Sequence, residues 1–348
     1  MLEQAITREI HSFTPAGRRD QRLQMIGGQT LGVSEAGRPL VGIELGVGPR
    51  RATLLAGAHA DEPVGPETLM YFAEWLAGES EEARKLRKGW RFRIVPHVNP
   101  DGEASNSQWI DAWPDPLACL RHRRREPPGR DVEFAYPDGR AENEAAADFM
   151  RPAAPIALHV SLHGMTAATG AWHLIDRDSI ERTAELRARY AEAVVEAGLG
   201  LLDWDRGGEK GFEYIAAGFS TTPTGQAMRK HFKAAGDSAT AGKFRDSSME
   251  LAGKLSADAS LEGAAGPLCM VTELPLWLVR SDRVEDEPRD PKAFFAFGEA
   301  VDAAREALAR NDTDAALAAV GDFELEPVPI HTACRLQLRA IELGLSAA

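Results

Sequence analysis

Three continuous apolar runs constrain the fold of this chain most strongly. They are ATLLAGA (52–58), PIALHVSLHG (155–164) and LCMVTEL (268–274), and each has small or polar residues in its last three positions. Such runs are typical of strands that are buried on both faces, as in sheets covered by helices on each side. Because apolar residues at helical spacing follow the first run over 66–76, the chain predicts strands that alternate with helices in an α/β fold.

The segments around these runs extend the predicted sheet. LQMIGG (23–28) and PLVGIELGV (39–47) lie on either side of a polar turn, which predicts two paired antiparallel strands. WRFRIVPHV (90–98) alternates large apolar residues with arginine, as a strand does. Residues 103–140 show no periodicity and predict a long loop. We therefore expect a mixed sheet of about eight strands with helices on both faces.

The domain organisation follows from the absence of a linker. No Pro/Ser-rich stretch and no repeat divides the 348 residues, so the sequence predicts one domain over 1–290. Residues 291–348 carry a mostly helical pattern, and we expect them to form a C-terminal extension packed on the same domain.

Charge and cysteine content exclude several classes of function. A net charge of −13 leaves no basic face for a phosphate backbone, so we expect no nucleic-acid partner. Three widely spaced cysteines indicate neither a disulfide framework nor a thiolate zinc site, and no apolar run is long enough for a membrane span. We expect a cytoplasmic protein without membrane contact; the sequence does not indicate its oligomeric state.

Two predicted strand ends carry residues that suit a metal ion. His59 and Glu62 follow the strand of 52–58, and His163 ends the strand of 155–164, next to Gly164. In open α/β sheets, binding sites lie at the carboxyl ends of the strands. Two histidines and one glutamate, with a fourth position open for water, are typical of a catalytic zinc site.

Other histidines compete for the same role. His159 is a rival third ligand, but it lies four residues before His163 and therefore about 13 Å away along a regular strand. Only one of the two can reach the ion, and the strand-end residue is favoured. We interpret His159 as a buried core histidine, and we expect His97, His173 and His231 to be structural.

Five motifs in order resemble the M14 family of zinc metallocarboxypeptidases, the carboxypeptidase A type. They are EAGRPL (35–40), GAHADEP (57–63), PHVNPDG (96–102), LHG (162–164) and TELP (272–275). They are similar, respectively, to the family's Gly-Arg-Pro turn, its His-x-x-Glu motif, its Asn-Pro-Asp-Gly turn, the segment of its third zinc ligand and the segment of its catalytic glutamate. The resemblance implies a zinc carboxypeptidase-like fold.

The resemblance also implies roles for individual residues. His59, Glu62 and His163 would bind one zinc ion per chain, and Glu273 would be the general base. A carboxylate near a metal-bound water can take its proton and return it to the leaving amine.

The run LRHRRR (120–125) resembles the family's Trp-Arg-x-x-Arg stretch, which would make Arg124 the arginine that stabilises the oxyanion. Four arginines in five positions leave the register open, and Arg121 is the alternative, with a role in binding substrate.

The chain departs from the family where peptide-cleaving members bind the substrate carboxylate with an Asn-Arg pair. Glu133 and Phe134 stand at those positions, where we expect them to contact the substrate. A carboxylate and a phenyl ring cannot clamp a carboxylate as an arginine fork does. Arg229, Lys230 or Arg280 could supply the missing charge.

The sequence as a whole indicates a zinc-dependent hydrolase of peptide or amide bonds with altered specificity, acting on a small peptide or an N-acyl amino acid. One alternative is a zinc deacylase of small N-acyl amino acids, of the aspartoacylase or succinylglutamate desuccinylase type. A second alternative is a non-catalytic binding protein on the same fold.

Overall fold

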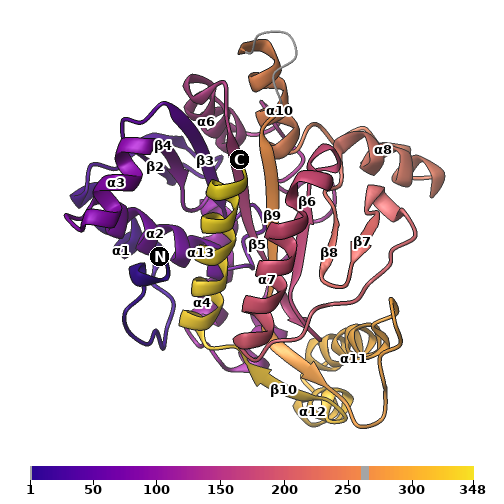
Figure 1. Ribbon diagram of the computed structural model, residues 1–348. Coiled ribbons are helices and arrows are strands. Elements are labelled where there is room, and N and C mark those ends of the chain that lie inside the picture. The colour runs from indigo at the N-terminus through magenta and orange to yellow at the C-terminus, as the bar shows by residue number, and fades with distance from the viewer. Residues whose placement is uncertain (1, 260–265) are drawn as a thin grey trace.

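A mixed ten-stranded sheet runs through the part of the chain that the computed structural model describes, residues 2–259 and 266–348 (Figure 1). Its order is β1-β2-β4-β3-β5-β9-β6-β8-β7, and β10 pairs with β9. The strands are β1 (Gln29–Val33), β2 (Pro39–Leu45), β3 (Arg50–Ala56), β4 (Trp90–Val95), β5 (Leu158–Ala168), β6 (Trp172–Ile175), β7 (Tyr214–Ala216), β8 (Phe219–Thr221), β9 (Leu268–Arg280) and β10 (Glu324–Pro327).

The centre of the sheet is parallel. Strands β4, β3, β5 and β9 pair in parallel in that order, whereas β1, β2 and β4 pair antiparallel, as predicted for the start of the sheet. On the other side β6 is antiparallel to β9 and parallel to β8. The predicted mixed sheet is thus confirmed, with ten strands among the described residues in place of about eight.

Helices cover both faces of this sheet, as the buried runs predicted. Helices α2 and α13 pack on one face and α6 and α10 on the other, and α7 lies beside α13 (Figure 1). The helices are α1 (Ala16–Met25), α2 (Val64–Ala77), α3 (Glu81–Gly89), α4 (Pro100–Ile110), α5 (Pro116–His122), α6 (Ala141–Met150), α7 (Ala184–Glu196), α8 (Gly225–Ala234), α9 (Ser238–Ala241), α10 (Ser248–Ala259), α11 (Lys292–Ala309), α12 (Thr313–Val320) and α13 (Ile330–Ala347).

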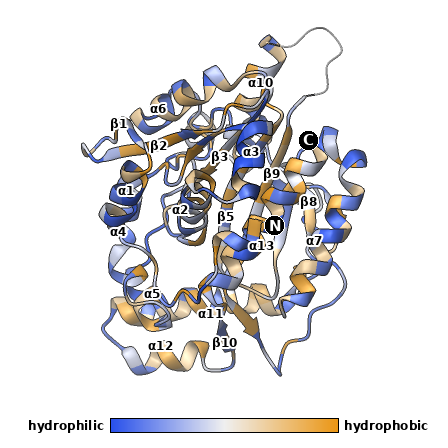
Figure 2. Cartoon of the chain, turned by 60° about the vertical axis from the view of Figure 1, so that its left-hand side comes forward, coloured by the Kyte–Doolittle hydropathy of each residue, from blue (hydrophilic) through white to orange (hydrophobic). Residues whose placement is uncertain are grey.

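Hydropathy follows this layering. Figure 2 shows hydrophobic residues along the central strands and mostly hydrophilic residues on α1 and α4 at the edge. One apolar cluster fills the space between the sheet and α2, α7 and α13, and a second lies under α6 and α10. None of the described helices is both long and apolar enough to cross a membrane.

Two local predictions were wrong. The segment 23–28 was predicted as a strand, but it forms the end of α1 and a turn, and the first strand starts at Gln29. The segment 103–140 was predicted as a loop, but it contains most of α4 and all of α5. Helix α4 is largely polar and shows no apolar period; it is fixed instead by its cap, where the Asn99 side chain accepts a hydrogen bond from the Gly102 amide at 3.0 Å.

The C-terminal residues 291–348 form three helices and one strand. The predicted helical character is present in α11, α12 and α13, but β10 was not predicted; it pairs antiparallel with β9. Helix α13 is an integral layer of the fold, because it packs between α2 and α7 on the central sheet. The division into a domain over 1–290 and an extension remains a prediction, and residues 1 and 260–265 lie outside the described part.

Gln337 on α13 connects this helix to two central strands. Its side chain is fully buried, and its amide donates to the His163 carbonyl at 3.0 Å and to Thr272 Oγ1 at 3.2 Å. The Thr68 hydroxyl on α2 donates to Gln337 Oε1 at 2.7 Å. A single amide therefore satisfies polar groups of α2, β5 and β9 beneath the middle of β5.

We expect Gln337→Ala to lower the free energy of unfolding by about 2–4 kcal/mol, because it removes the three buried hydrogen bonds of the Gln337 amide. Chemical denaturation of the variant and the parent measures the difference. Ser346→Ala, an exposed change on the same helix, is the control and should stay within about 0.5 kcal/mol of the parent. Equal stability of both variants would contradict the role given to Gln337.

Candidate metal centre and active site

Three predicted ligands converge where β3 ends and at the middle of β5. The prediction that the strand ends at His163 was wrong, because β5 continues to Ala168. His59 Nδ1 lies 2.9 Å from Glu62 Oε1, and His163 Nδ1 lies 3.0 Å from Glu62 Oε2. The two histidine Nδ1 atoms are 3.1 Å apart. One ligand atom from each of the three residues lies within 4.8 Å of the other two. Among the described residues, this is the group of histidines and carboxylates that could hold a metal ion.

The turn after β3 places the first two ligands. Gly57 has a φ of +73°, and a Cβ there would lie 2.6 Å from the buried His97 ring, so the turn requires glycine. The Glu62 amide then donates to the His59 carbonyl at 3.2 Å, which closes the turn. Since α2 begins two residues later, both side chains are held between a buried strand and a buried helix.

The middle of β5 places the third ligand. His163 is 2% exposed and is followed by Gly164, whose amide donates to Glu62 Oε2 at 3.2 Å. A Cβ on Gly164 would lie 2.9 Å from the Leu274 carbonyl of β9. Glycine therefore lets the backbone approach both the carboxylate and the neighbouring strand.

Contacts on the far side of the His163 ring fix its orientation. Its Nε2 lies 3.1 Å from Glu133 Oε2 and 2.9 Å from Ser161 Oγ. A carboxylate that accepts from one imidazole nitrogen leaves the other nitrogen free to bind a metal ion. Glu133 was predicted to bind substrate. Its side chain is only 5% exposed, and its carboxylate contacts and orients the His163 ring.

The charges at this centre are strongly coupled. Burial disfavours the carboxylate of Glu62, yet the neighbouring His59 and Arg125 charges hold its pKa well below the usual range. Burial likewise disfavours protonated His163, but Glu133 and Glu62 raise the pKa of that ring well above its usual value. In both cases the electrostatic partners outweigh burial, so the cluster draws a positive charge to its centre.

The ligand set fits a zinc ion. A tetrahedral ion with bonds of about 2.0–2.1 Å separates its ligand atoms by about 3.3 Å, close to the 2.9–3.1 Å found here. Two imidazole nitrogens with one carboxylate are donors that zinc prefers over magnesium or calcium. The predicted resemblance implies this metal, and the residues present can hold it.

Glu273 lies beside this set on the neighbouring strand. It pairs in register with His163 across β5 and β9 and lines two cavities together with His59. Burial and the nearby Glu62 charge raise the pKa of Glu273 well above the usual range. Among the described residues it has no hydrogen-bond or ion-pair partner, so its carboxylate is available to a substrate or a water.

The arginine that reaches the ligands is Arg125, and the structure does not bring Arg124 there. Asn106 bonds both the amide and the carbonyl of Arg124, at 2.8 and 2.9 Å. Because side chains alternate along an extended segment, Arg123 and Arg125 both point to Asp61, while Arg124 is exposed and bonds only backbone carbonyls. Arg125 Nη1 lies 2.7 Å from Glu62 Oε1.

Of the other residues predicted to contact the substrate, some lie near the ligand set and others lie far from it. Phe134 is buried against Phe244 and lines a cavity of about 280 Å³ at the ligand set, together with Glu133. Arg121 bonds Thr313 on α12 and lies away from the ligands. Arg280 pairs with Glu326 at the far end of β9.

The two remaining candidates for the carboxylate clamp do not line that cavity. Arg229 donates to the Phe244 carbonyl at 2.9 Å, and Lys230 lies on the same helix, α8.

The contacts of the other histidines indicate structural roles. His159, the rival ligand, bonds Thr53 at 2.7 Å and Ser248 at 3.0 Å inside the core. His97 accepts from the Asn99 amide, and His173 is fully buried with its ring against Tyr190. His231 lies on α8 with its ring against Phe232.

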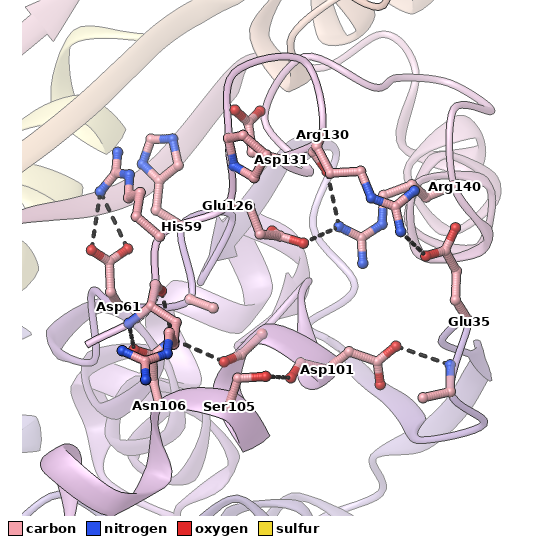
Figure 3. A pocket seen from close by; sticks show the side chains of 16 residues that line it. Glu35, His59, Asp61, Asp101, Ser105, Asn106, Glu126, Arg130, Asp131 and Arg140 are labelled. Carbon is pink, nitrogen blue, oxygen red and sulfur yellow. Dashed lines mark hydrogen bonds and ion pairs between the residues drawn. The ribbon is translucent and has the colours of Figure 1, made fainter. Parts of the chain in front are cut away.

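Three cavities meet at His59 and Arg125. The polar cavity, of about 480 Å³, opens beyond His59 and is ringed by charged side chains, among them Asp61, Glu126 and Arg140 (Figure 3). The second, of about 570 Å³, is lined by apolar residues, several of them aromatic, and by charged residues, and the third is the 280 Å³ cavity at Glu133 and Phe134. The candidate metal centre thus has space on several sides for the parts of a substrate.

Sequence reasoning missed Arg206 and Lys210, which line the 280 Å³ cavity. The Arg206 guanidinium lies 4.4 Å from the Trp204 ring centre and 4.2 Å from that of Phe212, and its side chain is 11% exposed. Aromatic residues on both sides of a lone arginine, in a Gly-rich segment without periodicity, were the available signal.

Comparison with known proteins agrees with the predicted resemblance. Residues 20–146 match the family model described as zinc carboxypeptidase. The carboxypeptidase E of Caenorhabditis elegans is 32% identical over 98 residues, which cover 23% of this chain and 21% of the relative. The zinc carboxypeptidase A 1 of Anopheles gambiae is 28% identical over 153 residues, 40% of this chain and 33% of the relative. The matches thus span a third or less of these relatives.

Solved structures give long but distant matches. The metallo-carboxypeptidase of Burkholderia cenocepacia has a TM-score of 0.48 and 15% identity, covering 96% of this chain and 70% of that chain. The carboxypeptidase A of Helicoverpa armigera has a TM-score of 0.49 and 11% identity, covering 99% and 78%.

The family match includes His59 and Glu62 and ends before His163 and Glu273. The roles of the latter two residues stay a prediction from their motifs. Residues 20–146 are thus similar to the M14 family of zinc carboxypeptidases, and the predicted resemblance is confirmed.

Proposed function

We propose that this protein is a zinc-dependent hydrolase of peptide or amide bonds, with His59, Glu62 and His163 as metal ligands and Glu273 as general base. One observation carries the proposal. Three ligand atoms converge within 4.8 Å, and an unpartnered glutamate lies on the adjacent strand at the same cavities.

Each residue has a definite task in such a reaction. A bound zinc ion would lower the pKa of its water and polarise the scissile carbonyl. Glu273 takes the proton of the attacking water and delivers it to the leaving nitrogen. Arg125, held by Glu62 and Asp61, stabilises the negative charge that develops on the carbonyl oxygen. Glu133 keeps the His163 ring in the orientation that binds the metal.

The substrate is proposed to be a small peptide or an N-acyl amino acid. The cavities at the metal centre measure about 280–570 Å³, which suits a group of that size. Phe134 cannot bind a substrate carboxylate, so Arg206 and Lys210 are the cations available in that cavity. A panel of free peptides, C-terminal peptide amides and N-acyl amino acids would separate carboxypeptidase from deacylase activity.

We expect the parent protein to hold about one zinc ion per chain after dialysis and the His163→Ala variant to hold much less, because a ligand is lost. Elemental analysis measures the ion. His11→Ala is the control, since His11 is 83% exposed and takes no part in the site. A parent that binds no zinc even when zinc is supplied would favour the non-catalytic binding protein.

We expect Glu273→Gln to keep its zinc and to lose hydrolysis by about 10²–10⁴-fold, because the amide cannot accept the proton. The rate is measured on the best substrate of the panel. Glu326→Gln, an exposed change on β10, is the matched control and should keep the parent rate. Substantial hydrolysis by a zinc-loaded Glu273→Gln variant would remove Glu273 as the base.

We expect Arg125→Gln to lower kcat/KM by about 10²-fold or more, and Arg124→Gln to lower it less, since Arg125 alone of the two points to the ligands. Zinc content is measured in both variants, so that loss of metal is not mistaken for loss of catalysis. The reverse order of the two losses would restore Arg124 as the oxyanion residue.

A further inference from the structure

A second group of charged residues lies at the opposite edge of the central sheet. Strand β3 begins at Arg50 and β4 at Trp90, so Arg51 and Arg91 are each the second residue of their strand. Arg51 lies about 17 Å along the strand from the end of β3, and the turn with His59 follows that end. This group of residues is therefore separate from the three cavities at the candidate metal centre.

Arg51 and Arg91 are neighbours across the sheet. They are register partners in the parallel pair of β3 and β4, so their side chains leave the same face of the sheet from strands about 5 Å apart. Arg93, two residues further along β4, lies on this face as well. Helix α6 covers the face at this point (Figure 1), because the Arg93 guanidinium donates to the Phe149 carbonyl at 2.5 Å and lies 4.9 Å from the centre of the Phe149 ring.

The protein neutralises one of these three cations and leaves the other two. Arg93 Nη2 lies 2.5 Å from the carboxylate of Glu44 on β2. Arg51 donates to the Ala154 carbonyl, which carries no net charge. Arg91 has neither a hydrogen bond nor an ion pair among the described residues, and its Nε is buried without a partner. The described part of the chain thus supplies no carboxylate within 4.0 Å of Arg51 or Arg91.

The residues on either side of the two arginines cannot supply the missing charge. Toward β5 the next residue is Ala157, whose amide donates to the Arg51 carbonyl at 2.9 Å. Toward β2 it is Gly46, where a Cβ would lie only 2.2 Å from the Trp90 carbonyl, so no side chain fits there. Both arginine side chains are half-buried, and water screens their repulsion less than at a free surface. Two adjacent positive charges therefore remain without a counter-charge.

Two adjacent guanidinium groups favour an oxyanion with more than one negative charge. The planar N–H donors of arginine match the oxygens of a carboxylate or a phosphate. A carboxylate would neutralise only one of the two arginines, whereas a phosphate monoester carries a charge of about −1.5 to −2 near pH 7 and three acceptor oxygens. The balance of charge therefore favours a phosphate group.

We propose that Arg51 and Arg91 form a binding site for a phosphate group, free or carried by a small ester, and that Arg93 holds the end of α6 beside it. The site is independent of the proposed hydrolase, because none of the three residues lines a cavity at the metal centre. A phosphate bound there removes the repulsion between the first residues of β3 and β4, and so stabilises the folded chain.

The test measures binding of two probes, inorganic phosphate and glycerol 3-phosphate. Each is titrated into the full chain by calorimetry at constant ionic strength, with chloride as the balancing anion. We expect the parent to bind at least one of them at one site per chain, and the tighter of the two shows whether the group is free or esterified. Arg91→Gln should weaken this binding by about tenfold or more, and Arg91→Lys by less, because lysine keeps the charge without the planar fork.

Arg84→Gln is the matched control, since it removes the same charge from an exposed residue of α3 that is paired with Glu79 at 2.9 Å. It should leave the affinity for the probes unchanged, and so should His163→Ala. Phosphate that binds at the metal centre would be lost in His163→Ala and kept in Arg91→Gln, and this result would overturn the proposal. Failure of the parent to bind either probe would overturn it as well.

Thermal unfolding distinguishes a ligand site from an arginine that only supports the fold. Because Arg91 has no bonded partner in the described part of the chain and repels Arg51, Arg91→Gln should unfold at no lower temperature than the parent in phosphate-free buffer. Added phosphate should raise the unfolding temperature of the parent more than that of the variant. A variant that is less stable without phosphate and gains as much from phosphate as the parent would assign Arg91 a structural role and contradict the proposal.

Discussion

The parallel pairing of β3, β5 and β9 is the constraint on which the candidate site depends. In this register Ala56 pairs with Leu162, and His163 pairs with Glu273. Because parallel strands end at the same edge of a sheet, the turn with His59 and Glu62 lies beside His163 and the glutamate. A one-residue shift of β5 would turn His163 to the opposite face and separate the ligands.

The same edge of the sheet carries several buried carboxylates, and the protein's own cationic side chains do not fully neutralise them. Glu62, Asp61, Glu133 and Glu273 lie around two imidazoles and the Arg125 guanidinium. A buried carboxylate without a partner is costly, and a cation bound between the ligands reduces that cost. Binding of metal and packing of the strand ends are therefore expected to stabilise each other, with Gln337 fixing the backbone of His163 from below.

The sequence predicts the site residues that the apolar runs carry, but it places His163 and Glu273 at strand ends, whereas they lie within β5 and β9. His59, Glu62, His163 and Glu273 follow apolar runs, and the sheet brings all four together. The arginine could not be identified in this way, because its register is set by Asn106, a residue on α4 that fixes the Arg124 backbone. Helix α4 itself was missed, since its polar face gives no period and its start depends on the cap at Asn99.

Substrate recognition is also hard to predict from the sequence, because it depends on contacts between segments that are far apart along the chain. The metal ligands depend on the central strands, whose apolar character is visible in the chain, whereas the walls of the 570 Å³ cavity come from the ends of α5 and α11 and the segment with Trp204. Their approach is decided by packing between segments far apart in sequence. The predicted ligand set and the substitution of Phe134 are thus independent of each other, because specificity and metal binding belong to different parts of the fold.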